Sequence, residues 1–108
     1  MPDLAPSEYL YVLRPTRLAM LTAGPTPAEA AVVGEHFAYL QALTERGVMI
    51  LVGRTLNNDA ETLGLAIFRA GSEAEARAIM ENDPAVRQGV MTAKLYPYRI
   101  ALMAAAHS

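Results

Sequence analysis

The stretch TPAEAAVVGEHFAYLQALTERG, from Thr26 to Gly47, decides how the rest of the chain is arranged. Pro27 suits the first turn of a helix, and Glu29 follows Thr26 by three residues, the spacing of a capping box. Gly47 is the residue type that commonly ends a helix. The segment therefore predicts one long helix. Its apolar residues recur at helical spacing and form one stripe that includes a histidine: Val32, Val33, His36, Phe37, Tyr39, Leu40 and Leu43.

The segments on both sides of this helix have the composition of β-strands. Glu8 to Arg14 (EYLYVLR) is rich in aromatic and β-branched residues and is followed by Pro15, which cannot donate to a sheet. Downstream, Val48 to Val52 and Gly64 to Arg69 flank a turn-forming stretch and predict a hairpin. The residues between Pro15 and Pro25 show no period and predict a long loop.

The last third of the chain repeats the pattern of a helix followed by a strand. Ser72 and Glu75 have capping-box spacing and predict a second helix that ends near Asn82. Pro84 to Gln88 predicts one further helical turn with Asp83 as its cap. Val90 to Leu102 predicts a long final strand, with a bulge or an edge position where Pro97 interrupts it.

The order of elements is strand, helix, strand, strand, helix, strand, which is the ferredoxin-like βαββαβ arrangement of the α+β class. We expect a four-stranded antiparallel sheet with both helices on one face. The other face would be bare, so we expect a second copy of the chain to cover it. At 108 residues the chain is predicted to be one domain, residues 1–108, with its core in about residues 9–102.

Composition excludes several functional classes. A hydrophobic fraction of 53% is too high for a disordered chain, and a net charge of -2 without a basic block disfavours nucleic-acid binding. The chain has no cysteine, which rules out disulfides, thiol catalysis and thiolate metal sites. It has neither the pattern of a signal peptide nor an apolar run long enough to span a membrane, so we expect a soluble cytoplasmic protein.

Two residues are candidates for chemistry. His36 is one of only two histidines and lies in the apolar stripe, where an imidazole can act as a base near neutral pH or can simply be a core residue with a satisfied hydrogen bond. Asp83 would look toward the sheet if the second helix kept its register, but Asp before Pro is also an ordinary helix cap. The other histidine, His107, is expected to be a tail residue.

Arginines at the ends of elements, and one tyrosine, are candidates for ligand binding. A guanidinium can hold a carboxylate or phenolate with two hydrogen bonds, so Arg14, Arg54 and Arg87 are candidate anion anchors or, alternatively, solvated surface residues. Tyr39 shares the helical face of His36 and is either a binding residue or part of the core. No metal site is expected, because one useful histidine and scattered carboxylates make a poor ligand set.

Five segments resemble one known family, the YciI-like or YCII-related proteins, over roughly Tyr9 to Leu102. They are VVGEHFAYLQALTERG, VGRTLN, AGSEAEA, MENDPAVRQG and KLYPYRI. The resemblance implies a ferredoxin-like domain that pairs as a dimeric α+β barrel, and the family's proposed active-site pair falls on His36 and Asp83. One branch of the family resembles a dehydrochlorinase of chlorinated hydroxyquinols, and muconolactone isomerase has a related fold.

These observations lead to one main hypothesis and two alternatives. The main hypothesis is a cofactor-independent lyase or isomerase for a small anionic or phenolic ring compound. In it His36 is the base, Asp83 orients it and stabilises the imidazolium, and Arg54 anchors the anion with help from Arg14 and Tyr39. The main alternative is a non-catalytic ligand-binding or accessory module, and a third is a monooxygenase-like enzyme. We expect a homodimer with a small-molecule ligand, no cofactor, and neither a nucleic-acid nor a membrane partner.

Overall fold

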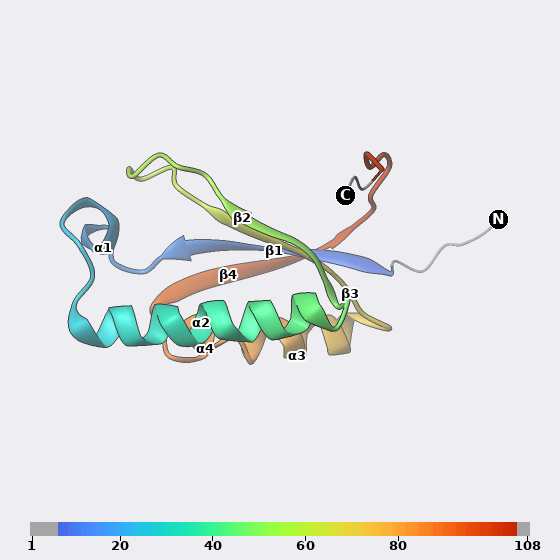
Figure 1. The fold of residues 1–108 in the computed structure, drawn as a ribbon, viewed down its shortest axis with the longest axis horizontal. Coiled ribbons are helices and arrows are strands. Elements are labelled where there is room, and N and C mark those ends of the chain that lie inside the picture. The colour runs from blue at the N-terminus through green and yellow to red at the C-terminus, as the bar shows by residue number, and fades with distance from the viewer. Residues whose placement is uncertain (1–6, 106–108) are drawn as a thin grey trace.

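The computed structural model describes residues 7–105 and shows one antiparallel sheet with its main helices on one face (Figure 1). The sheet has the strand order β2-β3-β1-β4, so β1 and β3 are central and β2 and β4 are edges. In chain order the elements are β1 (Glu8–Pro15), α1 (Ala19–Thr22), α2 (Pro27–Glu45), β2 (Met49–Arg54), β3 (Gly64–Arg69), α3 (Glu73–Glu81), α4 (Pro84–Arg87) and β4 (Met91–Tyr98).

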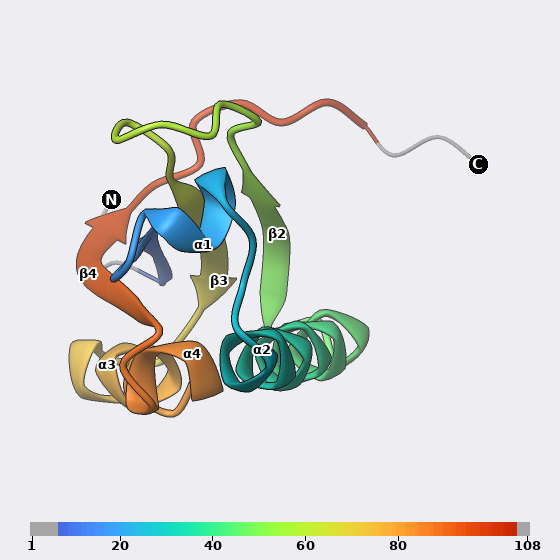
Figure 2. The same cartoon turned by 90° about the vertical axis from the view of Figure 1, so that its left-hand side faces the viewer.

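The ferredoxin-like prediction is confirmed. Figure 2 shows α2 beside α3 and α4 in one layer beneath the sheet. The alternation of side chains along β1 turns Tyr9, Tyr11 and Leu13 toward the helices, where all three are buried. Leu40 and Leu43 of α2 meet them in the core. The sheet and the helix layer therefore share one core.

The helix caps determine where α2 and α3 begin. The Thr26 hydroxyl accepts from the Glu29 N–H at 3.1 Å and the Glu29 carboxylate accepts from the Thr26 N–H at 2.8 Å, so the first capping box is complete. The second is only half formed. The Ser72 hydroxyl accepts from the Glu75 N–H at 3.1 Å, but the Glu75 carboxylate accepts from the N–H of Gly71 at 2.7 Å instead of closing on Ser72.

Several sequence predictions need correction. The loop from Pro15 to Pro25 contains a short helix, α1, which buries Met20. The final strand ends at Tyr98 and not at Leu102, because Tyr98 pairs with Glu8, the first residue of β1, and residues 7–105 hold no strand segment that could pair beyond Tyr98. Phe37, assigned to the apolar stripe, is 66% exposed. The apolar stripe of α2 is wider than the face that packs against the core, and Phe37 lies at its margin.

The face of the sheet opposite the helices carries apolar side chains that no other element in residues 7–105 covers. Ile67 of β3 is at its centre, paired with Leu10 of β1 and Leu51 of β2. Leu51 is exposed, and Leu10, Val12 and Ile67 are only half-buried. We call this surface the free sheet face.

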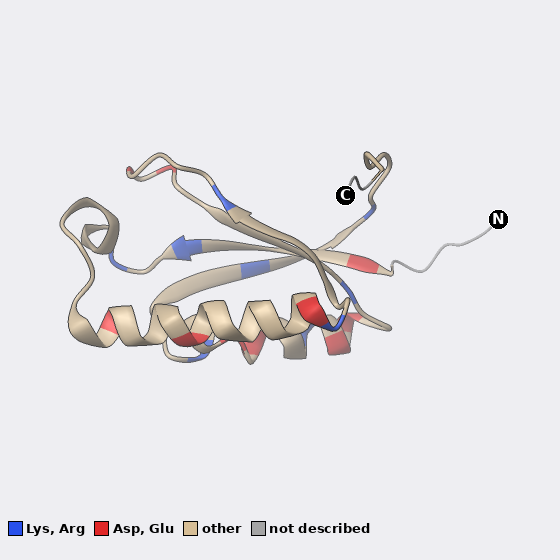
Figure 3. Ribbon diagram, viewed as in Figure 1, with Lys and Arg blue, Asp and Glu red and all other residues tan. Residues whose placement is uncertain are grey.

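Neither a membrane-spanning helix nor a cluster of basic residues on one element is found in the described part of the chain. Residues 7–105 contain no helix that is both long enough and apolar enough to cross a membrane. Figure 3 shows Lys and Arg distributed over separate strands, loops and helices and not gathered on one element.

Candidate active site

His36 and Asp83, the two residues singled out in the sequence, are in direct contact. The Nδ1 atom of His36 lies 2.7 Å from Oδ1 of Asp83, although the two residues are 47 positions apart. The position of His36 on α2 turns its ring toward the sheet, and its side chain is 12% exposed. Because a carboxylate can only accept, Nδ1 carries the shared proton, and in the neutral ring Nε2 then has a lone pair. A histidine in this state can take up a proton at Nε2.

Asp83 joins three parts of the fold through its fully buried carboxylate. It is the N-cap of α4, with Pro84 at the first helical position, and Oδ1 accepts from the Ala85 N–H at 3.0 Å as well as from His36. The capping interpretation and the pairing interpretation of Asp83 are therefore both fulfilled, and by the same oxygen atom.

The second oxygen of Asp83 has a partner that the sequence did not single out. Tyr11 of β1 donates its hydroxyl to Oδ2 at 2.9 Å. Burial, and then the charge of Asp83, raise the pKa of Tyr11 well above its usual value near 10. The usable signal in the sequence was the inward position of Tyr11 in a buried strand, since a buried tyrosine hydroxyl needs a hydrogen-bond partner.

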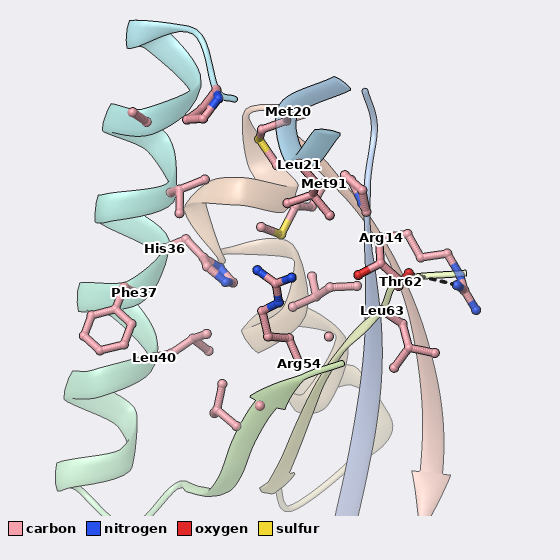
Figure 4. A pocket seen from close by; sticks show the side chains of 18 residues that line it. Arg14, Met20, Leu21, His36, Phe37, Leu40, Arg54, Thr62, Leu63 and Met91 are labelled. Carbon is pink, nitrogen blue, oxygen red and sulfur yellow. Dashed lines mark hydrogen bonds between the residues drawn. The ribbon is translucent and has the colours of Figure 1, made fainter. Parts of the chain in front are cut away.

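A pocket of about 570 Å³ opens beside the pair (Figure 4). It lies between the first half of α2 and the ends of β1, β2 and β3, and α1 covers one side. His36 lines it, whereas Asp83 and Tyr11 do not. Its walls are otherwise mainly apolar: Leu13, Met20, Leu21, Val33, Phe37, Leu40, Val52, Leu63 and Met91. Apolar walls with a few polar groups are typical of small-molecule sites.

Arg54 is the charged group that faces His36 across this pocket. Figure 4 shows its guanidinium extending from the end of β2 toward the wall that carries His36. Its Nε donates to the Thr55 carbonyl at 2.9 Å and a terminal nitrogen donates to Oδ1 of Asn58 at 2.8 Å. These two bonds orient the guanidinium and leave further N–H groups for a ligand. Asn58 lies in the stretch whose composition predicts only a turn.

The other binding candidates are placed differently. Arg14 lines the pocket, but its guanidinium donates to the Thr62 carbonyl at 3.2 Å and points away from the centre in Figure 4. Tyr39 is not among the lining residues, because its hydroxyl donates to the Ile79 carbonyl at 2.7 Å. Burial, and then the charge of Asp83, raise the pKa of Tyr39. Arg87 is exposed on α4 and is likewise absent from the pocket.

The pair is not part of a larger cluster of potential metal ligands. Within residues 7–105, no three side chains among His, Cys, Asp and Glu gather closely enough to hold a metal ion.

Comparisons with known proteins identify a family and include a solved structure of the same fold. The family described as the YCII-related domain matches residues 9–97. The structure is 5-chloro-2-hydroxyhydroquinone dehydrochlorinase (TftG) from Burkholderia phenoliruptrix AC1100 in complex with 2,5-dihydroxybenzoquinone. It is 21% identical, with a TM-score of 0.60 over 84% of this chain and 93% of that one, and so shares the fold. No curated protein matches this chain by sequence.

Proposed function

Because the chain belongs to the YCII-related domain family, we propose that it is a small-molecule enzyme of the lyase or isomerase type that works by proton transfer. The observation that carries this proposal is the hydrogen-bonded His36–Asp83 pair, whose imidazole lines an apolar pocket that also holds Arg54. An isolated core histidine would need a hydrogen-bond partner but no adjoining cavity. Here the histidine has both.

In this proposal His36 is the base. Its Nε2 takes a proton from the substrate, and Asp83, 2.7 Å from Nδ1, holds the ring in one tautomer and balances the charge of the imidazolium. A positioned acid–base group contributes about 10²- to 10⁴-fold to a rate. Asp83 can serve this role because its own position is set by the α4 cap and by the sheet.

The pocket favours a flat, unsaturated ring compound with an acidic hydroxyl. Its apolar walls suit a ring, and a guanidinium at the opposite wall suits an anionic or phenolic oxygen. The ligand named for the neighbouring structure, 2,5-dihydroxybenzoquinone, is a compound of this chemical class. We therefore extend that class to this chain and take a chlorinated hydroxyquinol as the first candidate substrate.

The chemistry for such a substrate needs only acid–base steps. In a keto tautomer of the ring, the chlorine is carried by a tetrahedral carbon. When the base removes a proton from a ring hydroxyl, its electron pair moves through the ring and chloride leaves with the C–Cl electrons. The net change is loss of HCl, with no electron supplied from outside. His36 accounts for the proton and Arg54 for the developing negative charge.

We further propose that the active form is a homodimer that packs through the free sheet face. The apolar residues on this face, with Ile67 at the centre, have no cover within the described chain. A second copy placed against it would bury surface of the kind found in stable dimers, which bury about 1,600 Å² or more.

The test is chloride release from 5-chloro-2-hydroxyhydroquinone, together with binding of 2,5-dihydroxybenzoquinone measured by calorimetry. We expect His36→Gln to abolish chloride release while the quinone still binds, and Arg54→Met to weaken quinone binding. Arg77→Met, on the exposed side of α3, is the matched control and should change neither. Binding with no chloride release by the unmodified protein would favour the non-catalytic module, and oxygen uptake with the same substrate would favour a monooxygenase.

A further inference from the structure

Tyr11 contacts the pair from the side opposite to the pocket. Its hydroxyl is 2.9 Å from Oδ2 of Asp83, its side chain is fully buried, and it does not line the pocket. It can therefore influence a bound molecule only through Asp83 and His36. In the proposed function this hydroxyl only helps to fix the position of Asp83.

We propose that Tyr11 is a positioning residue. Its bond to Oδ2 of Asp83 keeps Oδ1 facing Nδ1 of His36, and thereby holds His36 in the tautomer with a free Nε2. This inference rests on the proposed function for its catalytic consequence. Its structural part, the control of the His36 tautomer, holds for the ligand-free protein whatever the substrate is.

The two oxygens of the Asp83 carboxylate have different hydrogen-bond donors. Oδ1 accepts from the Ala85 N–H and faces Nδ1 of His36, whereas Oδ2 accepts only from Tyr11. Without the Tyr11 hydroxyl, Oδ2 would be a buried anionic oxygen with no donor among the described residues. The carboxylate would then gain by turning to share its donors between both oxygens. Such a turn would lengthen the bond to His36.

Tyr11 is suited to hold the carboxylate still. Its ring packs edge-on against Phe68 of the neighbouring strand, with ring centroids 5.6 Å apart and an angle of 74° between the rings. It extends from β1, a central strand bonded on both sides. The bond thus ties the junction of α3 and α4 to the most constrained part of the sheet, across 72 residues of sequence.

The direction of the hydrogen bond is also settled. Burial and the adjacent carboxylate raise the pKa of Tyr11, so the phenol stays protonated and acts as the donor. The bond from the Tyr11 hydroxyl to a carboxylate oxygen is charge-assisted and therefore stronger than one between neutral groups.

The decisive experiment compares Tyr11→Phe with Tyr9→Phe. Tyr9 lies two residues earlier on the same strand, also packs against Phe68 and has no contact with the pair, so it is a matched control. The chain has only two histidines, and the ¹⁵N spectrum of the His36 ring reports its tautomer directly. We expect the unmodified protein and Tyr9→Phe at pH 8 to show a single Nδ1–H tautomer. Tyr11→Phe should show a mixture and lose the downfield Nδ1 proton signal.

Kinetics supply a second readout. Because Tyr11 does not line the pocket, Tyr11→Phe should lower kcat for chloride release on the order of ten- to a hundredfold, the scale for a displaced catalytic group, and leave KM unchanged. If the protein releases no chloride at all, the proposed function fails, and the ring spectrum still decides the role of Tyr11. A His36 spectrum in Tyr11→Phe identical to that of the unmodified protein would overturn the proposal, provided that Asp83→Asn changes it.

A second substitution covers the case in which Tyr11→Phe does not fold. Replacing Tyr11 by 3-fluorotyrosine keeps the hydroxyl and makes it a stronger donor. Stronger donation to Oδ2 draws charge from Oδ1, so we expect the Nδ1 proton signal of His36 to move upfield. The same replacement at Tyr9 should leave it in place. An unmoved signal in the variant at Tyr11 would refute the coupling.

Discussion

Replacing Asp83 by alanine should destabilise the protein much more than replacing it by asparagine. Alanine removes the cap of α4, which costs about 1 kcal/mol, and leaves the buried Tyr11 hydroxyl without an acceptor, which costs about 1–3 kcal/mol. His36 Nδ1 also loses its partner, at a smaller cost because the ring is partly exposed. We therefore expect Asp83→Ala to lose about 3 kcal/mol of unfolding free energy.

Asparagine avoids most of this cost. Its amide oxygen can still accept from the Ala85 N–H and from Nδ1 of His36, in the place of Oδ1. Its NH₂ group then faces Tyr11, whose hydroxyl can turn to accept instead of donate. The hydrogen bonds from His36 and from the Ala85 N–H lose their charged acceptor, but a buried charge is removed as well. We expect a loss of about 1 kcal/mol or less.

Urea unfolding at one protein concentration, followed by circular dichroism, measures the difference between the two variants. A gap of about 2 kcal/mol corresponds to roughly 10 °C in Tm for a domain of this size. Equal losses in both variants would show that Asp83 organises neither Tyr11 nor the cap, and the account of the site would be wrong. Both variants should lose chloride release, because neither supplies a negative charge beside His36.

Two further predictions concern other parts of the fold. The hydrogen bond from Arg17, and then that from the Thr26 N–H, lower the pKa of Glu29 from 4.5 to about 2. A lowered pKa stabilises the fold above the unfolded value and ceases to do so as pH falls through the folded value. Glu29→Gln should therefore be less stable than the unmodified protein at pH 7, by a margin that shrinks below pH 4.5 in urea titrations. Ile67→Lys, at the centre of the free sheet face, should convert an 11.6 kDa chain from dimer to monomer in sedimentation equilibrium; an unmodified protein that already sediments as a monomer would contradict the dimer.

The elements were predictable because local chemistry and tertiary structure agree in most of this chain. Thr26, Pro27 and Glu29 specify the start of α2 by contacts within four residues, so no knowledge of the rest of the fold is needed. The inward face of β1 follows from simple alternation. The predictions that failed concern features that depend on other elements of the fold. The length of β4 is set by where β1 begins, and the exposure of Phe37 is set by how much of α2 the sheet covers.

The site was predictable only in part for a related reason. His36 and Asp83 were identifiable because each is unusual where it stands, a histidine in an apolar stripe and an aspartate before Pro84. Their contact depends on how α2 packs against α4, and the resemblance to a family, not the spacing, indicated that they belong together. Tyr11 is an ordinary strand residue until the fold places its hydroxyl beside Asp83. Asn58 orients Arg54 from a loop whose conformation its composition does not determine.

The arrangement of charges around the pocket restricts the class of compound that it favours as a substrate. In the proposed reaction, proton transfer to His36 moves one positive charge onto the imidazole, beside Asp83, and leaves one negative charge on the ligand. The Arg54 guanidinium, which extends toward the wall of His36 in Figure 4, can stabilise that negative charge. A saturated alcohol would hold the charge on the single oxygen that lost its proton. A conjugated ring spreads it to a second oxygen, which Arg54 can bind while the first stays beside His36. A pocket that offers a cation as well as a base therefore favours a conjugated phenol or enol over a saturated compound of equal size.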